Sequence, residues 1–204
     1  MSLKWNRPAG SLSATLILAH GAGAPMDSPF MERIAELLAA QGIAVARFEF
    51  PYMAQRREDG RKRPPNPQAQ LLDCWRRVHA QVRETLDGKS MGGRMASLLA
   101  DELDADALVC LGYPFYAAGK PEKPRVAHLA GLRTPTLIVQ GERDALGNRE
   151  AVAGYALAPT IRLHWLAAAD HDLKPLKASG LTHEQHLAAT AREVAGFLGG
   201  LQGH

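Results

Sequence analysis

Residues 88–92 read Gly88-Lys89-Ser90-Met91-Gly92, with one serine two residues from a glycine on each side. A serine on a sharp turn from a strand into a helix holds its hydroxyl out as a nucleophile, and only small residues fit two positions to either side. Apolar side chains recur at helical spacing over residues 93–103, so Ser90 is expected to open a helix. The amides and dipole of a helix N-terminus favour developing negative charge. The pentapeptide therefore predicts a nucleophilic serine.

Length and composition indicate one globular domain. The chain has 204 residues, 46% hydrophobic and 22% charged, with a formal charge of +3. Much of the positive excess lies in residues 56–63, so the charge does not indicate nucleic-acid binding. Cys74 and Cys110 are too few for a disulfide framework, which favours a reducing cytoplasm. No apolar run has signal-peptide or membrane-span length, so we expect a cytoplasmic protein that does not engage a membrane.

The order of predicted elements is that of an α/β fold. Buried-type strands are expected over residues 14–19, 43–50, 107–111, 136–140 and 161–166, and helices over 28–40, from 68 onward and over 182–198. Proline and positive charge predict a surface loop without an element over residues 51–67. Alternating strands and helices predict a mostly parallel sheet with helices on both faces, in a single domain over residues 1–204 without a large lid.

The chain contains a serine and the two residue types that could activate it, in an order along the sequence that indicates catalysis. In α/β-hydrolases the nucleophile, the acid and the histidine follow successive strands as Ser, Asp or Glu, then His. This chain offers Ser90, Asp144 and His171 in that order, the last two in loops that follow predicted strands. His171 would take the serine proton, and Asp144 would fix the histidine tautomer. Backbone amides of Met91 and Ala22 are the expected oxyanion hole.

Four motifs together resemble a compact bacterial α/β-hydrolase of the dienelactone-hydrolase-like kind. They are His20-Gly21-Ala22-Gly23, residues 88–94, Gly141-Glu142-Arg143-Asp144 and Asp170-His171. The resemblance covers the chain from Ala14 to Leu198 and looks closest to a small bacterial branch that is similar to testis-expressed and chromatin-associated homologues in animals. It implies an α/β-hydrolase fold and ester-type hydrolysis, but it does not fix a substrate.

One segment departs from this resemblance. The strand before the nucleophile is expected to hold about half a dozen apolar residues. Between the helix that starts at Gln68 and Gly88 only residues 84–87 are available, and they are too short and too polar. Either a stunted strand begins near Val82, or the sequence lacks a segment of the natural chain. We favour the second interpretation, because an open sheet beside the nucleophile should not fold.

Two nucleotide-binding interpretations fit less well. Residues 88–90 match the end of a phosphate-binding loop, but Arg83 stands where that motif requires its first glycine. Gly21 and Gly23 match the start of a dinucleotide-binding turn, but Met26 stands at the third glycine position.

Non-catalytic interpretations of the serine and the histidines stay open. The serine could be incidental to a glycine-rich turn, and a member of this fold could bind a partner without catalysing a reaction. His20 is expected to shape the first turn rather than to react. His183 and His186 stand at helical spacing without nearby carboxylates or cysteines, so no metal site is expected.

The favoured interpretation is a serine esterase, or with less support an amidase, that works through an acyl-enzyme and needs no cofactor. Its partner is a small-molecule ester, and the protein is expected to be a monomer or a homodimer. Tyr113, Phe115 and Tyr116 could line the pocket. Arg61 and Arg63, in the basic loop, could attract an anionic group on the substrate.

Overall fold

The computed structural model describes residues 2–82 and 85–201. Its strands form one seven-stranded sheet in the order β1-β3-β2-β4-β5-β6-β7. The strands are β1 (Lys4–Asn6), β2 (Ala14–Ala19), β3 (Ile43–Phe48), β4 (Thr85–Lys89), β5 (Leu108–Leu111), β6 (Thr136–Gly141) and β7 (Ile161–Leu166). Only β1 runs antiparallel to its neighbour, and the other strands are parallel. The loops that follow the parallel strands therefore meet at one edge of the sheet.

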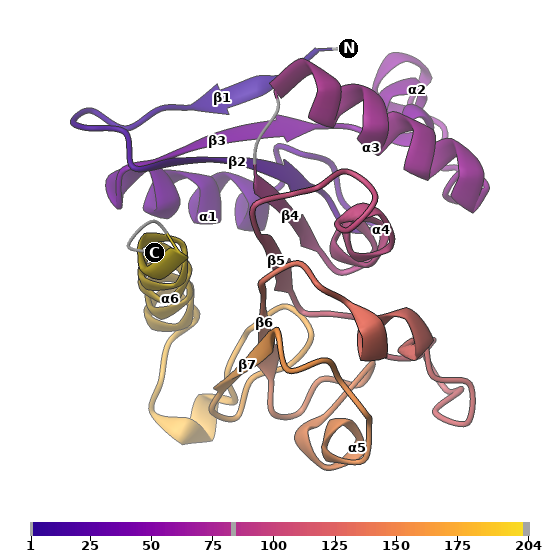
Figure 1. The fold of residues 1–204 in the computed structure, drawn as a ribbon, viewed down its shortest axis with the longest axis vertical. Helices are drawn as coiled ribbons and strands as arrows, with labels where there is room; N and C mark the ends of the chain where they lie inside the picture. Colours follow the sequence, from indigo (N-terminus) through magenta and orange to yellow (C-terminus); the bar gives the residue numbers. More distant parts are fainter. Residues whose placement is uncertain (1, 83–84, 202–204) are drawn as a thin grey trace.

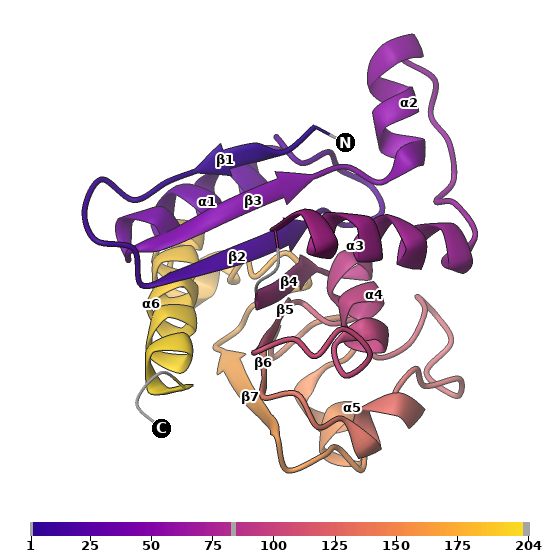
Figure 2. The same cartoon turned by 45° about the horizontal axis from the view of Figure 1, so that its top comes forward.

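Helices cover both faces of this sheet (Figures 1 and 2). The helices are α1 (Pro29–Ala40), α2 (Pro51–Asp59), α3 (Gln68–Val82), α4 (Met91–Leu99), α5 (Arg149–Ala153) and α6 (His183–Leu201), with short 3₁₀ turns η1 (Ala127–Gly131) and η2 (Lys177–Ser179). The mostly parallel α/β fold with helices on both faces is thus confirmed. None of the helices within the described ranges combines the length and hydropathy of a membrane span.

The core has two halves, one on each face of the sheet. In β2, Leu16 and Leu18 pack with the half that contains α1 and α6, whereas Ile17 and Ala19 pack with the half that contains α3 and α4. This alternation follows from the two-residue period of a strand. All of β2 beyond its first residue is buried, as expected for a strand covered on both faces.

The prediction of a surface loop over residues 51–67 is wrong in its first half, because residues 51–59 form α2. Pro51 is the first residue of this helix, where its missing N–H and fixed φ are tolerated. In its first turn Tyr52 and Met53 are buried, and the helix ends at Gly60, which has a φ of 72°. The proline at its start and the glycine after its end are sequence signals for this helix. The run of charged residues between them led to the prediction of a loop.

The prediction that residues 84–87 cannot supply the strand before Ser90 is also wrong. Residues 85–89 form β4, which pairs in parallel with both β2 and β5, while α3 continues to Val82. Glu84 lies outside the described residues. Strand pairing uses backbone groups, so a five-residue segment that pairs with a strand on each side can complete the ladder. The sheet is therefore continuous beside Ser90 without any additional segment.

Candidate active site

Ser90 stands on a strained turn between β4 and α4. Its φ of 51° and ψ of −113° are unusual for a residue with a side chain. The Ser90 amide donates to the carbonyl of Leu111 at 3.0 Å, and the Ser90 carbonyl accepts from the Arg94 amide at 3.0 Å. The turn is thus held by β5 on one side and by the first turn of α4 on the other.

Close backbone contacts require the glycines around this turn. A Cβ atom at Gly88 would lie 2.2 Å from the amide nitrogen of Gly93. A Cβ atom at Gly92 would lie 2.7 Å from the Cβ atom of Ala19 on β2. No larger residue fits at either position without moving backbone, which is the physical basis of the sequence pattern around Ser90.

The structure brings Ser90, His171 and Asp144 together in one hydrogen-bonded chain. His171 Nε2 lies 2.8 Å from Ser90 Oγ, and His171 Nδ1 lies 2.8 Å from Asp144 Oδ2. Asp144 is fully buried, whereas 24% of the His171 side chain is exposed. A hydroxyl, an imidazole and a buried carboxylate in this order can move a proton away from the serine.

Asp144 is fixed by donors from its own region of the chain. Gln140 Nε2 donates to Asp144 Oδ2 at 2.8 Å, and the Leu146 amide donates to Asp144 Oδ1 at 2.8 Å. Gln140 is itself buried at the end of β6 and also bonds the backbone of Tyr113. The carboxylate therefore has one orientation, with an oxygen directed at His171.

Lys89 holds the loop that carries His171. Its Nζ atom donates to the carbonyl oxygen of His171 and lies 3.5 Å from Asp172 Oδ1. The Asp170 carboxylate accepts from the amides of Asp172 and Lys174 and so closes the loop on itself. Burial lowers the pKa of the Lys89 ammonium, an effect opposed by the charge of Asp172.

His183 and His186 support the same loop from α6. His183 Nε2 lies 2.9 Å from the carbonyl oxygen of Asp172, and His186 Nδ1 lies 3.0 Å from that of Leu173. Both histidines thus act on the backbone beside His171. Among the described residues, no group of three or more histidine, cysteine or acidic side chains is placed to hold a metal ion.

The two predicted oxyanion donors lie beside Ser90. Met91 is the first residue of α4, so its N–H lacks an acceptor within the helix. Ala22 follows β2, and its carbonyl accepts from the Tyr52 hydroxyl at 2.9 Å. His20 fixes the same turn, because its Nδ1 bonds the carbonyl of Gly21 and its Nε2 accepts from the amide of residue 50. Burial lowers the pKa of His20, in keeping with the shaping role expected for it.

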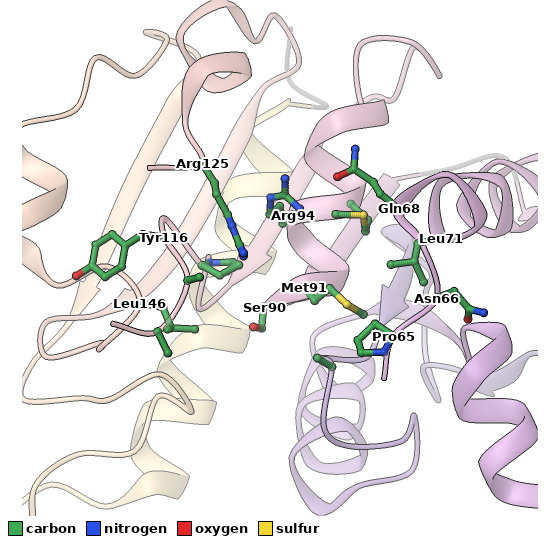
Figure 3. Close-up of a pocket in the computed structure, with 15 residues that line it drawn as sticks. Pro65, Asn66, Gln68, Leu71, Ser90, Met91, Arg94, Tyr116, Arg125 and Leu146 are labelled. Atoms are coloured by element: carbon green, nitrogen blue, oxygen red, sulfur yellow. The ribbon is translucent and has the colours of Figure 1, made fainter. Parts of the chain in front are cut away.

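Two cavities meet at Ser90 and Ala22. The first, here called the arginine cavity, has a volume of about 440 Å³ (Figure 3). The second, here called the lysine cavity, has a volume of about 390 Å³. The arginine cavity is lined by Ala22, Pro65, Asn66, Gln68, Leu71, Ser90, Met91, Arg94, Met95, Pro114, Tyr116, Ala117, Ala118, Arg125 and Leu146. The lysine cavity is lined by residues 21–24, Ser28, Phe30, Met31, Lys89, Ser90, His171 and Asp172.

Of the residues predicted to bind substrate, some line a cavity in the structure and others do not. Tyr116 lines the arginine cavity, but Tyr113 and Phe115 are fully buried and line neither cavity. Arg61 and Arg63 also line neither cavity, and Arg63 forms an ion pair with Asp59, the last residue of α2. Their role in substrate binding stays a prediction that the lining of the cavities does not support.

Sequence reasoning missed the cationic residues that do line the site. Arg94 stands four residues after Ser90, hence on the same side of α4, and this spacing was a usable signal. Arg125 comes from the loop between β5 and η1, and nothing in its sequence context indicated the site.

Comparisons with known proteins identify the family and support the fold. A family model described as an alpha/beta hydrolase domain matches residues 12–199. Est1E from Butyrivibrio proteoclasticus superposes with a TM-score of 0.73 at 18% identity, over 99% of this chain and 94% of that chain. An alpha-beta serine hydrolase homologue from Coxiella burnetii gives 0.63 at 19% identity, over 97% and 89%. A serine hydrolase without lid from Xanthomonas campestris gives 0.63 at 20% identity, over 98% and 86%. At these identities the likeness to the solved structures concerns the fold.

Proposed function

Because the chain belongs to the alpha/beta hydrolase domain family, we propose that it is a serine hydrolase that cleaves a carboxylic ester through an acyl-enzyme on Ser90. Hydrolysis of an amide is the less favoured form of the same chemistry. The proposal includes a single domain without a large lid. We also propose a cytoplasmic location, which is supported by the low number of cysteines in the sequence.

One observation carries the proposal, namely the hydrogen-bonded chain from Asp144 through His171 to Ser90. Both donor–acceptor distances are 2.8 Å, within the range expected for a working proton relay. A serine hydroxyl is a weak nucleophile until a base accepts its proton. His171 is placed to be that base, and Asp144 is placed to stabilise the imidazolium that results.

The proposed reaction has two steps. His171 Nε2 takes the proton of Ser90 as Oγ bonds to the ester carbonyl carbon, and the amides of Met91 and Ala22 hold the resulting oxyanion. The intermediate then expels the alcohol, which receives the proton from His171 and leaves an acyl group on Ser90. Water repeats the sequence with His171 as base and releases the carboxylic acid. Each oxyanion donor contributes on the order of 10²- to 10³-fold in rate, and the sequence of steps needs no cofactor.

Structural neighbours support an ester as the substrate class. Est1E is one such neighbour, and another structure of similar fold is an esterase domain from a Rhodothermus marinus protein. The two cavities beside Ser90 offer room for the acyl and the alcohol parts of a small ester. Their volumes fall in the range of small-molecule sites, about 300–1,000 Å³.

The test is covalent labelling with a fluorophosphonate, followed by intact-mass spectrometry. Wild-type protein is expected to gain one phosphonyl group, and Ser90→Ala none, because only an activated serine reacts at a useful rate. Ser11→Ala, which removes an exposed hydroxyl outside the site, is the matched control and should label like wild type. If folded wild-type protein stays unlabelled, the proposal is wrong and a non-enzymatic, partner-binding role takes its place.

A further inference from the structure

The charged side chains that line the arginine cavity are all positive. Among the residues that line it, the charged side chains are Arg94 and Arg125, and none is acidic. Figure 3 shows both arginine side chains along the same wall of the cavity, above Ser90. Arg94 comes from α4 and Arg125 from the loop after β5, so tertiary structure brings the two guanidinium groups together.

Neither guanidinium has an acidic partner among the described residues. Several other arginines do, for example Arg57 with Asp27 and Glu49, and Arg76 with Glu102. Arg94 is half-buried, and its Nε atom is buried without a hydrogen-bond partner. A buried donor without an acceptor is destabilising, and more so when it is charged. This arrangement is therefore unfavourable until an acceptor arrives.

Two hydrogen bonds fix the backbone at Arg125, whose side chain lines the cavity. The Arg125 amide donates to the carbonyl of Phe115 at 2.6 Å, and the Tyr113 hydroxyl donates to the Arg125 carbonyl at 3.1 Å. Burial lowers the pKa of Arg94, and the charge of Arg125 lowers it further. Two guanidinium groups that line one cavity without an acidic partner are typical of a site for an anion.

From these contacts we infer that the arginine cavity binds a carboxylate of the substrate, so that the enzyme acts on esters that carry a second, free carboxylate away from the scissile bond. The inference rests on the proposed function at Ser90. A planar carboxylate matches the fork of donors that a guanidinium presents, and two arginines can hold it from two directions. The apolar part of the lining contains Leu71, Met91, Met95 and Leu146, which suit the hydrocarbon chain between the carboxylate and the ester.

The experiment compares matched esters that differ in charge. Para-nitrophenyl hydrogen adipate and para-nitrophenyl hexanoate have acyl chains of equal length, and only the first ends in a carboxylate. Butyrate esters of para-hydroxybenzoate and para-hydroxybenzamide place the same difference on the alcohol side. The measured quantity is the ratio of kcat/KM for the anionic ester to that for its neutral partner.

Wild-type protein should prefer the anionic member of at least one pair. Arg125→Gln and Arg94→Gln should each lower the ratio for that pair by about tenfold to a hundredfold, as for a charge-assisted hydrogen bond. Lys123→Gln removes an equal charge from the same exposed loop without touching the cavity, and it should leave the ratio unchanged. Arg125 is exposed, so its variant should fold even where the half-buried Arg94 is less tolerant.

Binding is measured separately, so that the two proposals can fail independently. Calorimetry on Ser90→Ala with the adipate ester should give a Kd that rises at least tenfold when Arg125→Gln is added. If neutral esters are cleaved but wild type shows no preference, or all arginine variants keep the wild-type ratio, the carboxylate site is wrong and the esterase proposal survives. If nothing is cleaved and Ser90 does not label, the esterase proposal is wrong, and the calorimetry alone decides the carboxylate site.

Discussion

The arginine cavity and the lysine cavity lie on either side of Ser90 and use their cationic side chains in opposite ways. Lys89 is surrounded by partners, namely the carbonyl of His171, the carboxylate of Asp172 and the ring of Phe30 at 5.2 Å from Nζ. Arg94 and Arg125 have no such partners among the described residues. A buried cation whose partners come from the protein fixes the segment that it contacts, whereas a cation that lacks an acceptor is available to a ligand. The partners of a charged side chain therefore indicate its role better than its charge alone.

The largest expected effect comes from Ser90, which lines both cavities. Ser90→Ala should lower kcat for a neutral ester by about 10⁴- to 10⁶-fold, because it removes the nucleophile from a cooperating set. Steady-state hydrolysis of para-nitrophenyl hexanoate measures this, and circular dichroism checks the fold. A loss below tenfold would show that Ser90 is not the nucleophile.

Lys89→Met tests the paired cation of the lysine cavity. The variant keeps an unbranched side chain of similar size but removes the donor to the His171 carbonyl, so His171 should move from its hydrogen bond with Ser90. We expect kcat to fall by about tenfold to a hundredfold with a smaller change in KM, since small displacements of a catalytic group have effects of this size.

Two readouts separate this positioning role from a general loss of stability. The rate of fluorophosphonate labelling should fall in parallel with kcat at temperatures where the variant is fully folded. Lys174→Met removes an exposed charge from the same loop and should have no such effect. Unchanged kcat and labelling in Lys89→Met would show that the pairing of Lys89 does not matter to His171.

Tyr52→Phe tests the turn that lines both cavities. It removes the hydroxyl that donates to the Ala22 carbonyl, and the Ala22 amide should then hold the oxyanion less well. The expected loss in kcat is about threefold to tenfold, the size of one neutral hydrogen bond. Tyr155→Phe removes a hydroxyl outside both cavities and serves as control. An equal loss in both variants would contradict a specific role for Tyr52.

The smallest effect concerns acid stability near the arginine cavity. Burial lowers the pKa of His128, and the nearby charge of Arg94 lowers it further. The unfolded state therefore binds a proton at a higher pH than the folded state, so the free energy of unfolding should fall as the pH drops below about 6.5. One such group changes this free energy by at most about 1.4 kcal/mol per pH unit.

Urea unfolding of wild type and His128→Gln measures this slope. The slope between neutral pH and pH of about 5 should be shallower in the variant, while His20, whose pKa burial also lowers, retains its own contribution. Identical slopes in the two proteins would mean that His128 carries its proton as easily folded as unfolded.

Prediction from sequence succeeded where the signal is local. The strands over residues 14–19 and 161–166 have the bounds expected of them, and α1 and α3 begin within one residue of the predicted starts. It failed for β4, which pairs with β2 on one side and with β5 on the other. Propensity carries no information about such neighbours.

For the site, the amino-acid sequence is sufficient to identify Ser90, Asp144 and His171 as candidates, because the glycine pattern and the order of residues are properties of the chain. The tertiary structure decides which charges meet. Arg94 and Arg125 become neighbours only when the loop after β5 packs against α4, and Arg61 and Arg63, which follow α2, stay outside the lining of both cavities. Contacts between residues far apart in the chain are set by how helices and loops pack on the sheet, and no local pattern encodes them.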